Sequence, residues 1–191
     1  SLEAMCEAHY IYKHDKAGAE ELLDGDPHAK NLATIKHLSD RDHAKTFKYG
    51  ITYGAQPTKV AAILGCSKSE AKIAYDKFWE NNPGLKTVKT HLKHHADATK
   101  GWIQTIDGRP IETRSEHSQL NALFQSTGAI LMKYAMVIAD ARIRQEFNED
   151  EAYGLIRYHD EEIWECDNES IAERVGEIGC ASIAAAAEYL E

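Results

Sequence analysis

The sequence lacks long hydrophobic runs, internal repeats and low-complexity linkers. No apolar run approaches the roughly 18 residues that a membrane span needs, so we expect no membrane contact. The chain opens at Ser1 without a basic N-terminal region, so a signal peptide is not expected. Cysteine is scarce, and Cys6, Cys66, Cys166 and Cys180 lie too far apart for a metal knuckle or an evident disulfide framework. The simplest expected location is therefore a reducing cytoplasm.

The charge is acidic overall but unevenly distributed. The chain has 22 Lys and Arg against 31 Asp and Glu, a net charge of −9. Residues 145–191 hold 14 acidic residues and two Arg, so residues 1–144 carry a net charge of +3. Such asymmetry is typical of a basic binding face beside an acidic lobe. The simpler alternative is that the acidic residues only solvate helices.

Turn and cap signals predict an α+β fold. The first helical segment breaks at 24–27, where Asp26 caps a helix that begins at Pro27. Further helices are predicted over residues 41–54, from Ser67 or Ser69 to 81, and over 85–99, 117–147 and 168–190. Two hairpins are predicted, at 102–113 with the two-residue turn Asp107-Gly108, and at 152–166 with His159-Asp160 between its strands. The result is a helical lobe, and helices that cover a small antiparallel sheet.

The predicted helix at 41–53 carries cations and aromatic rings on one face. Arg41, Lys45 and Tyr49 are spaced four apart, so they share a side of the helix. Beside them lie Lys48, Thr52 and Tyr53. Cations suit a triphosphate, and a ring can stack on a base or sugar. The alternative is an amphipathic helix with snorkelling cations.

The predicted turn of the second hairpin contains carboxylates. His159-Asp160-Glu161 stands where two strands meet, so these side chains cannot hide in a core. Hard oxygen ligands of this type hold Mg²⁺, with waters and substrate phosphates completing the shell. Two such ions can clamp both oxygens of a phosphoryl displacement. A polar β-turn without metal is the alternative, because Asp is common in turns.

In combination these segments resemble family A DNA polymerases along essentially the whole chain. Residues Arg41–Gly54 (RDHAKTFKYGITYG) resemble the motif B helix, and Tyr158–Glu161 (YHDE) resemble motif C. Asp107–Arg109, followed by Asn121–Ala129, resemble the segment that touches the primer–template minor groove. Gly25–Asn31 resemble the fingers segment of the bacteriophage replicative branch. The order and spacing match, and together they are far more specific than each alone.

The resemblance implies a helical fingers subdomain and part of a palm with antiparallel hairpins and covering helices. Residues 1–24 would begin the palm and fingers with the tail of motif A, 25–100 would form the fingers, and 101–191 would form a palm portion with the motif C hairpin. The expected reaction is template-directed DNA synthesis, in which a dNTP is joined to a primer 3′-OH by a two-metal mechanism. The expected partners are primer–template DNA and dNTPs, and the cofactor is Mg²⁺.

The resemblance also assigns roles to individual residues. Those implied at the incoming nucleotide are Glu3, His28, Arg41, Lys45, Tyr49 and Tyr53. Those implied at the primer end and minor groove are Asn121, Gln125 and His159. Asp160 would ligate the catalytic metals with Glu161 adjacent, and Lys45 would protonate the leaving pyrophosphate. Glu3 would exclude ribonucleotides, and a Tyr at 49 implies acceptance of dideoxynucleotides.

One expected ligand has no counterpart in this sequence. Motif A of the family has an Asp a few residues before the Glu that Glu3 matches, and the sequence opens after that place. We therefore expect a fingers-and-palm piece of a split polymerase. Other polypeptides would supply the thumb, the motif A Asp and the C-terminal palm segment, and a processivity factor is a further candidate partner. A second hypothesis treats Ser1 as the residue after an intein junction, where a hydroxyl or thiol nucleophile is needed. The alternatives are an artificial boundary at this residue and a disordered region upstream of it.

Two other interpretations remain open at this stage. A non-catalytic nucleic-acid-binding remnant would keep the cationic helix and lose the metal site. A metal-binding or scaffold protein would use His91, His94 and His95, of which His91 and His95 are spaced as a ligand pair. Because lysines are interspersed there, we interpret this helix as a basic, solvated one that touches DNA phosphates.

Overall fold

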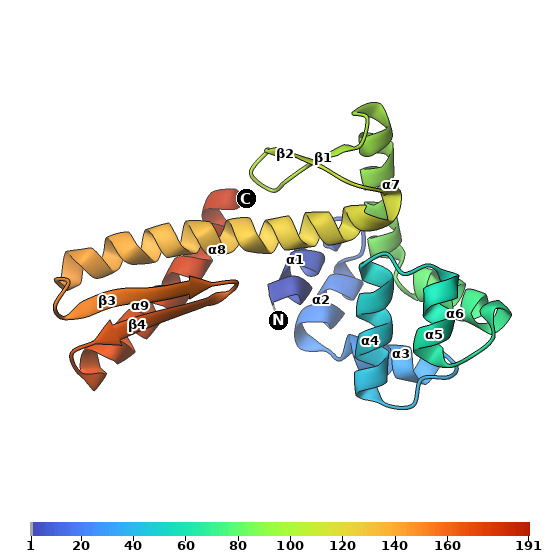
Figure 1. Cartoon of the computed structure of the whole chain (residues 1–191), viewed down its shortest axis with the longest axis horizontal. Coiled ribbons are helices and arrows are strands. Elements are labelled where there is room, and N and C mark those ends of the chain that lie inside the picture. Colours follow the sequence, from blue (N-terminus) through green and yellow to red (C-terminus); the bar gives the residue numbers. More distant parts are fainter. Residues whose placement is uncertain (1) are drawn as a thin grey trace. The chain divides into compact units, whose positions relative to one another are not determined.

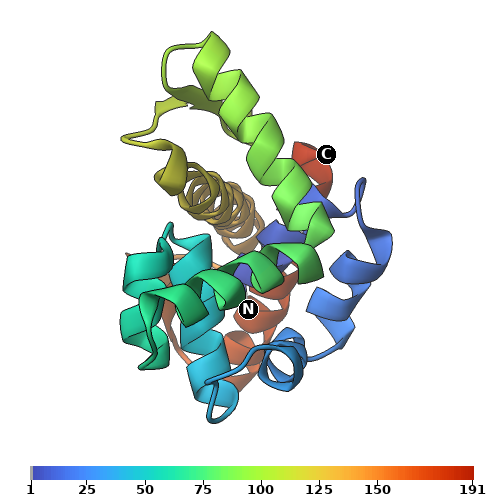
Figure 2. The same cartoon turned by 90° about the vertical axis from the view of Figure 1, so that its right-hand side faces the viewer.

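The computed structural model describes residues 2–191 (Figures 1 and 2). Ser1, on which the splicing hypothesis rests, lies outside the described residues. In chain order the elements are α1 (Leu2–Ile11), α2 (Lys16–Asp24), α3 (Pro27–Thr34), α4 (Arg41–Thr52), α5 (Pro57–Leu64), α6 (Lys68–Asn81), α7 (Pro83–Ala98), β1 (Trp102–Gln104), β2 (Pro110–Glu112), the 3₁₀ turn η1 (Glu116–Ser118), α8 (Gln119–Glu146), β3 (Ala152–Tyr158), β4 (Glu161–Cys166) and α9 (Glu169–Leu190). The expected α+β class is confirmed.

The chain divides into two compact units. The first comprises residues up to 105 together with 110–125, and the second comprises 106–109 together with 126–191. The boundary falls inside α8, which contributes residues to both units. The division into fingers at 25–100 and palm at 101–191 comes from the family resemblance and stays a prediction.

The first unit is built around α4 and the helices that contact it. In this unit α4 packs against α3 and α5, α5 packs against α6, and α1 packs against α2 and α7 (Figure 2). Phe47 of α4 and Phe78 of α6 are fully buried and meet edge to face, with ring centroids 5.9 Å apart. Burying a Phe side chain stabilises the fold by about 1.5–3 kcal/mol. The apolar face of α4 is therefore fixed in the core, and its Arg41 and Lys45 side stays exposed.

Local signals account for the helix starts. Asp26 caps α3 by accepting from the backbone N–H groups of His28 and Ala29, and Asp40 caps α4 by accepting from that of His43. Helix α5 is not among the helices predicted from the sequence. Pro57 in its first turn and Gly65 just past its end, at φ +60°, are the signals that bracket it.

Gly54, the last residue of the motif B resemblance, is constrained in two ways. It has φ +95°, and a Cβ at this position would stand 2.4 Å from the His117 carbonyl oxygen. We expect Gly54→Ala to lower the unfolding free energy by about 3 kcal/mol, because backbone strain and a clash add. Gly65→Ala is the matched control: it has φ +60° and open space, so strain alone costs about 1 kcal/mol. Urea denaturation measures the unfolding free energy of both variants. An equal loss of unfolding free energy in the two would contradict the predicted clash at Gly54.

The first hairpin differs from the sequence prediction. Its register pairs Trp102 with Glu112 and Gln104 with Pro110, so residues 105–109 form a five-residue loop. The predicted two-residue Asp107-Gly108 turn is wrong. A tight turn of type I′ needs positive φ at both central residues, and within this loop only Gly108 has it, at φ +84°.

The second unit contains the hairpin predicted at 152–166. β3 and β4 pair antiparallel from Ala152 with Cys166 to Tyr158 with Glu161, with an irregularity between Gly154 and Ile156. Helix α9 packs against both strands, and its Val175 and Ile178 form a buried cluster with Ala139 and Ile143 of α8 and with Ala152 (Figure 1). The two-residue connection His159-Asp160 is confirmed.

Strand β3 presents exposed apolar side chains, and the long helix that contains α8 is apolar in composition. In β3 only Ala152 is buried, while Tyr153, Leu155, Ile156 and Tyr158 are exposed. Exposed apolar strands of this kind are typical of surfaces that another segment covers. By length and composition, the helix over Glu116–Glu146 could cross a membrane. Core helices of soluble proteins have the same length and composition, so this property alone does not indicate a membrane span.

Candidate active site

Helices α3 and α4 are joined at their N-termini by an ion pair. Asp26 caps α3 and also accepts a hydrogen bond from Arg41 Nε at 2.8 Å. The Arg41 guanidinium, with the cap hydrogen bonds, lowers the pKa of Asp26, and Asp26 raises the pKa of Arg41. Both side chains are well exposed, so the pair contributes little stability and can open for another anion. The sequence pattern predicts Asp26 as a cap but gives no sign of this partner.

A row of rings runs from α3 along α4. The ring centroids of His28 and Tyr49 are 6.0 Å apart, and those of Tyr49 and Tyr53 are 5.7 Å apart. Tyr53 is exposed, whereas His28 and Tyr49 are half-buried. The structure therefore brings together three of the residues predicted at a nucleotide, although they come from α3, from α4 and from the residue that caps the end of α4.

Glu3 anchors the far end of this row. One carboxylate oxygen of Glu3 accepts hydrogen bonds from the Tyr53 hydroxyl and from the Gln125 side-chain amide. Burial, and next this bond to Glu3, raise the pKa of Tyr53, so its hydroxyl stays protonated and acts as the donor. Residues 50 and 122 positions away from Glu3 in the chain thus meet at one carboxylate. Gln125, predicted at the primer, lies beside the predicted nucleotide residues.

Lys45 and Asn121 occupy separate positions in the same unit. Lys45 is exposed on α4, one turn after Arg41, and among residues 2–191 its ammonium forms no ion pair. Its charge acts on His28. Asn121 is half-buried in the first turn of α8. An exposed, unpaired ammonium one turn from a guanidinium is suited to a polyanion.

Lys48 is the cation for which the sequence-based prediction is wrong. The sequence places Lys48 beside the face that carries Arg41, Lys45 and Tyr49, but its side chain is 5% exposed. Its Nζ lies 3.1 Å from Oε2 of Glu7, whose side chain is 7% exposed. Thr52, grouped with it, is also buried and donates to the Lys48 carbonyl. The signal in the sequence that could have indicated a buried partner for Lys48 is Glu7, an acidic residue between the small residues Cys6 and Ala8 of α1.

His28 has an unusual electrostatic environment. Burial lowers its pKa below the ordinary 6.5, and the cations of Lys48, Arg41 and Lys45 lower it further against the opposing effect of Asp26. Its Nδ1 is buried without a hydrogen-bond partner in the described structure. The imidazole is therefore neutral at pH 7, and the nearby cations create a positive electrostatic environment that favours an anion.

The second unit presents the other predicted residues at the tip of its β3–β4 hairpin. His159 has φ +55°, and its ring contacts Tyr158 with centroids 4.1 Å apart. Asp160 and Glu161 are exposed, and in the described part of the chain neither carboxylate has an ion pair or side-chain hydrogen bond. The tight connection holds both carboxylates outside any core.

These two carboxylates fit a magnesium ion by their chemistry. Mg²⁺ prefers oxygen ligands and is commonly held by one or two carboxylates together with waters and substrate phosphates. Asp160 and Glu161 offer such oxygens, and no cation or side-chain donor among residues 2–191 occupies them. A two-metal site needs further carboxylates, so Asp160 and Glu161 alone would not complete one.

The histidines of helix α7 lie outside the metal-ligand group that the geometry of residues 2–191 brings together. His91, His94 and His95 are exposed, and the described residues place none of them in a group of three ligating side chains. His91 contacts the His14 ring at 5.1 Å between centroids. Lys93 pairs with Asp97 and Glu116. The prediction that α7 touches DNA phosphates stays a prediction.

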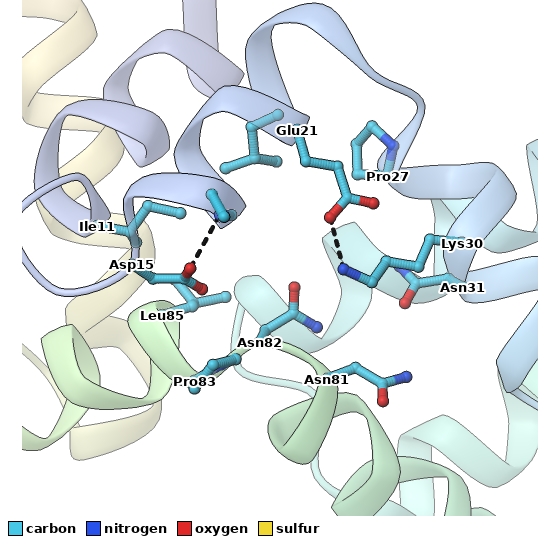
Figure 3. A pocket seen from close by; sticks show the side chains of 13 residues that line it. Ile11, Asp15, Glu21, Pro27, Lys30, Asn31, Asn81, Asn82, Pro83 and Leu85 are labelled. Carbon is cyan, nitrogen blue, oxygen red and sulfur yellow. Dashed lines mark hydrogen bonds and ion pairs between the residues drawn. The ribbon is translucent and has the colours of Figure 1, made fainter.

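A separate cavity of about 240 Å³ lies in the first unit among α1, α2, α3, α6 and α7 (Figure 3). The Glu21–Lys30 ion pair borders it on one side and Asp15 on the other (Figure 3). Its lining includes none of the residues predicted at the nucleotide, primer or metal. It is also smaller than most ligand pockets, which start at about 300 Å³.

Comparison with known proteins places the chain in a family. The family model described as DNA polymerase family A matches residues 26–188. The DNA-directed DNA polymerases of Enterobacteria phage T3 and Escherichia phage T7 are each 33% identical, over 93% and 91% of this chain and 28% and 27% of their own length. The polymerase domain of Pol1 from M. smegmatis, solved in complex with DNA primer–template and dNTP, has the same fold with a TM-score of 0.79 at 20% identity, covering 97% of this chain and 35% of that one. The chain therefore belongs to DNA polymerase family A.

Proposed function

We propose that this chain carries the nucleotide-binding face and part of the metal site of a template-directed DNA polymerase. The observation that carries the proposal is the grouping in the first unit. Arg41 and Lys45 lie one turn apart on α4, the rings of His28, Tyr49 and Tyr53 follow one another, and Glu3 closes the row. Cations beside stacked rings suit a dNTP.

Each residue has a proposed role that its environment supports. Arg41, Lys45 and His28 bind the triphosphate, and Lys45 gives a proton to the leaving pyrophosphate. Tyr49 packs on the sugar and base, and Tyr53 stands near the templating base. Glu3, oriented by Tyr53 and Gln125, occupies the 2′ side of the sugar and disfavours ribonucleotides.

The second unit is proposed to hold the metal, and residues of both units are proposed to contact the primer. Asp160, with Glu161 adjacent, binds Mg²⁺, which when bound stabilises charge on the attacking and leaving oxygens. His159, Asn121 and Gln125 hold the primer end and minor groove. Minor-groove acceptors are nearly uniform across base pairs, so these contacts test shape rather than sequence.

The chain spans about a quarter of the length of the phage relatives that it matches, namely 28% and 27%. We propose that it works with segments that correspond to the remainder, including a motif A carboxylate and a thumb. The test is primer extension with Mg²⁺ and four dNTPs, with the chain alone and mixed with a polypeptide that carries those segments. We expect extension only in the mixture. DNA binding without extension in any mixture would favour a non-catalytic remnant.

The electrostatics of His28 give a second, independent test. We expect NMR titration to give a His28 pKa below 6.5, because burial and nearby cations disfavour the imidazolium. The unfolded chain then binds this proton more readily, so the His28 contribution to stability falls as the pH drops through about 6.5. Adding a dNTP should raise the pKa, since triphosphate charge stabilises the imidazolium. The His28→Gln variant assigns the signal. A free-protein pKa at or above 6.5, or no rise with dNTP, would contradict this arrangement.

A further inference from the structure

Three side chains of different chemical type meet in the first unit, and none of them is among the residues proposed at the nucleotide. They are His37 in the α3–α4 loop, Cys66 in the α5–α6 turn, and Glu70 in the first turn of α6. One ligand atom from each lies within 4.8 Å of the other two, and His37 Nε2 is 3.6 Å from Glu70 Oε1. Among the described residues, these three form the group of His, Cys, Asp or Glu side chains that lie close enough together to hold one metal ion.

Local structure holds two of these ligands before any ion binds. Glu70 is part of a capping box, in which its Oε2 accepts from the Ser67 backbone N–H at 3.0 Å and the Ser67 hydroxyl at 2.6 Å. The other oxygen, Oε1, is the one near His37. Cys66 immediately precedes this cap, so its thiol is carried by the same turn. The capping box therefore orients one carboxylate oxygen toward the His37 ring.

We propose that His37, Cys66 and Glu70 bind a transition-metal ion of the Zn²⁺ class, with water as the fourth ligand. Imidazole nitrogen, thiolate sulfur and carboxylate oxygen are the ligands that Zn²⁺ takes, at about 2.0–2.3 Å. In a tetrahedral shell those distances place ligand atoms about 3.3–3.8 Å apart. The His37–Glu70 distance of 3.6 Å already lies in this range, and the two pairs with Cys66 lie within 4.8 Å, so they need to close by at most about 1.5 Å.

The donor set separates this ion from the Mg²⁺ of the proposed reaction. Mg²⁺ prefers oxygen ligands in octahedral geometry, whereas a thiolate selects softer ions. All three residues are exposed or half-exposed, so an ion reaches them without opening the core. On binding, the Cys66 thiol loses its proton to solvent and the sulfur forms the bond to the metal. Lys36, whose charge acts on Glu70, is a nearby cation that opposes binding.

A bound ion would link the α3–α4 loop to the α5–α6 turn. The α3–α4 loop that carries His37 leads directly to Asp40, the cap of α4. The turn that carries Cys66 joins α5 to α6, and α5 packs against α4. An ion that bridges them stabilises the folded state by binding it in preference to the unfolded chain. The site would thus fix the start of the helix that carries Arg41 and Lys45.

The test titrates the metal-free 191-residue chain with Zn²⁺ against a chromophoric chelator. We expect one ion per chain in the wild type and at least about a 100-fold loss of affinity in Cys66→Ser and in His37→Gln, more than the 10–100-fold typical of outer-shell partners. Cys180→Ser and His91→Gln are matched controls, because each removes the same ligand type elsewhere, and both should bind as the wild type does. With Co²⁺, a thiolate-to-metal absorption band should appear in the wild type and vanish in Cys66→Ser.

A further variant separates metal loss from misfolding. Glu70→Gln keeps a capping-box residue and removes the anionic ligand, so the chain should fold while Zn²⁺ binding weakens. Zn²⁺ should raise the Tm of the wild type and leave that of Cys66→Ser unchanged. Absence of stoichiometric binding, a Co²⁺ band that survives Cys66→Ser, or binding that is lost in His91→Gln would overturn the proposal. None of these measurements depends on polymerase activity, so they stand apart from the proposed reaction.

Discussion

Replacing Asp160 with Asn is expected to reduce primer extension on the order of 10³-fold in the reconstituted mixture, about 4 kcal/mol of transition-state stabilisation. Asp160 projects from a two-residue hairpin connection, is exposed, and forms no ion pair within residues 2–191. In the proposed reaction this carboxylate would hold a metal ion that acts on the reacting oxygens. Because Asn keeps the shape and removes the charge, binding of primer–template DNA should change little.

The matched control for this variant is Glu165→Gln. Glu165 is an exposed carboxylate on β4 of the same hairpin, opposite Tyr153 and away from the tip. Removing its charge changes the net charge of the hairpin equally, so extension should stay near the wild-type rate. Single-turnover extension with saturating dNTP measures both variants. If Asp160→Asn keeps more than about a tenth of the wild-type rate, or if the control loses as much, Asp160 is not a metal ligand.

Replacing Lys48 with Met is expected to lower the unfolding free energy by about 3–5 kcal/mol. The ammonium of Lys48 and the carboxylate of Glu7 are 3.1 Å apart, and their side chains are 5% and 7% exposed. The variant leaves the Glu7 charge buried without its partner, which is costly in a low-dielectric interior. Urea denaturation followed by tryptophan fluorescence gives the free energy.

Two comparisons make the Lys48 prediction specific. Lys72→Met breaks the exposed pair with Asp76, whose side chains are 57% and 50% exposed, so it should cost less than about 1 kcal/mol. The double variant Glu7→Leu with Lys48→Met removes both buried charges and should recover most of the loss. If Lys48→Met lowers the unfolding free energy by no more than Lys72→Met does, burial of the Lys48–Glu7 pair contributes nothing to the cost of breaking it.

Much of the fold could be predicted because its signals are local. Caps such as Asp26 and Asp40 act within three residues, and the spacing of apolar residues in α8 and α9 follows from helix geometry. The two-residue connection at His159-Asp160 was also predicted correctly. The first hairpin failed because the backbone at Asp107 does not adopt the positive φ that its predicted turn requires.

The sequence by itself determined the motif residues, their order and the family they indicate, because residue types and the spacing between them can be read directly from the chain. Which side chains meet was decided only by the tertiary structure. The shared contact of Glu3 with Tyr53 and Gln125, and the pair of Glu7 with Lys48, join residues far apart in the chain. Such contacts depend on how helices pack, and burial then decides whether a cation such as Lys48 pairs inside the core or, like Lys45, stays exposed at the surface.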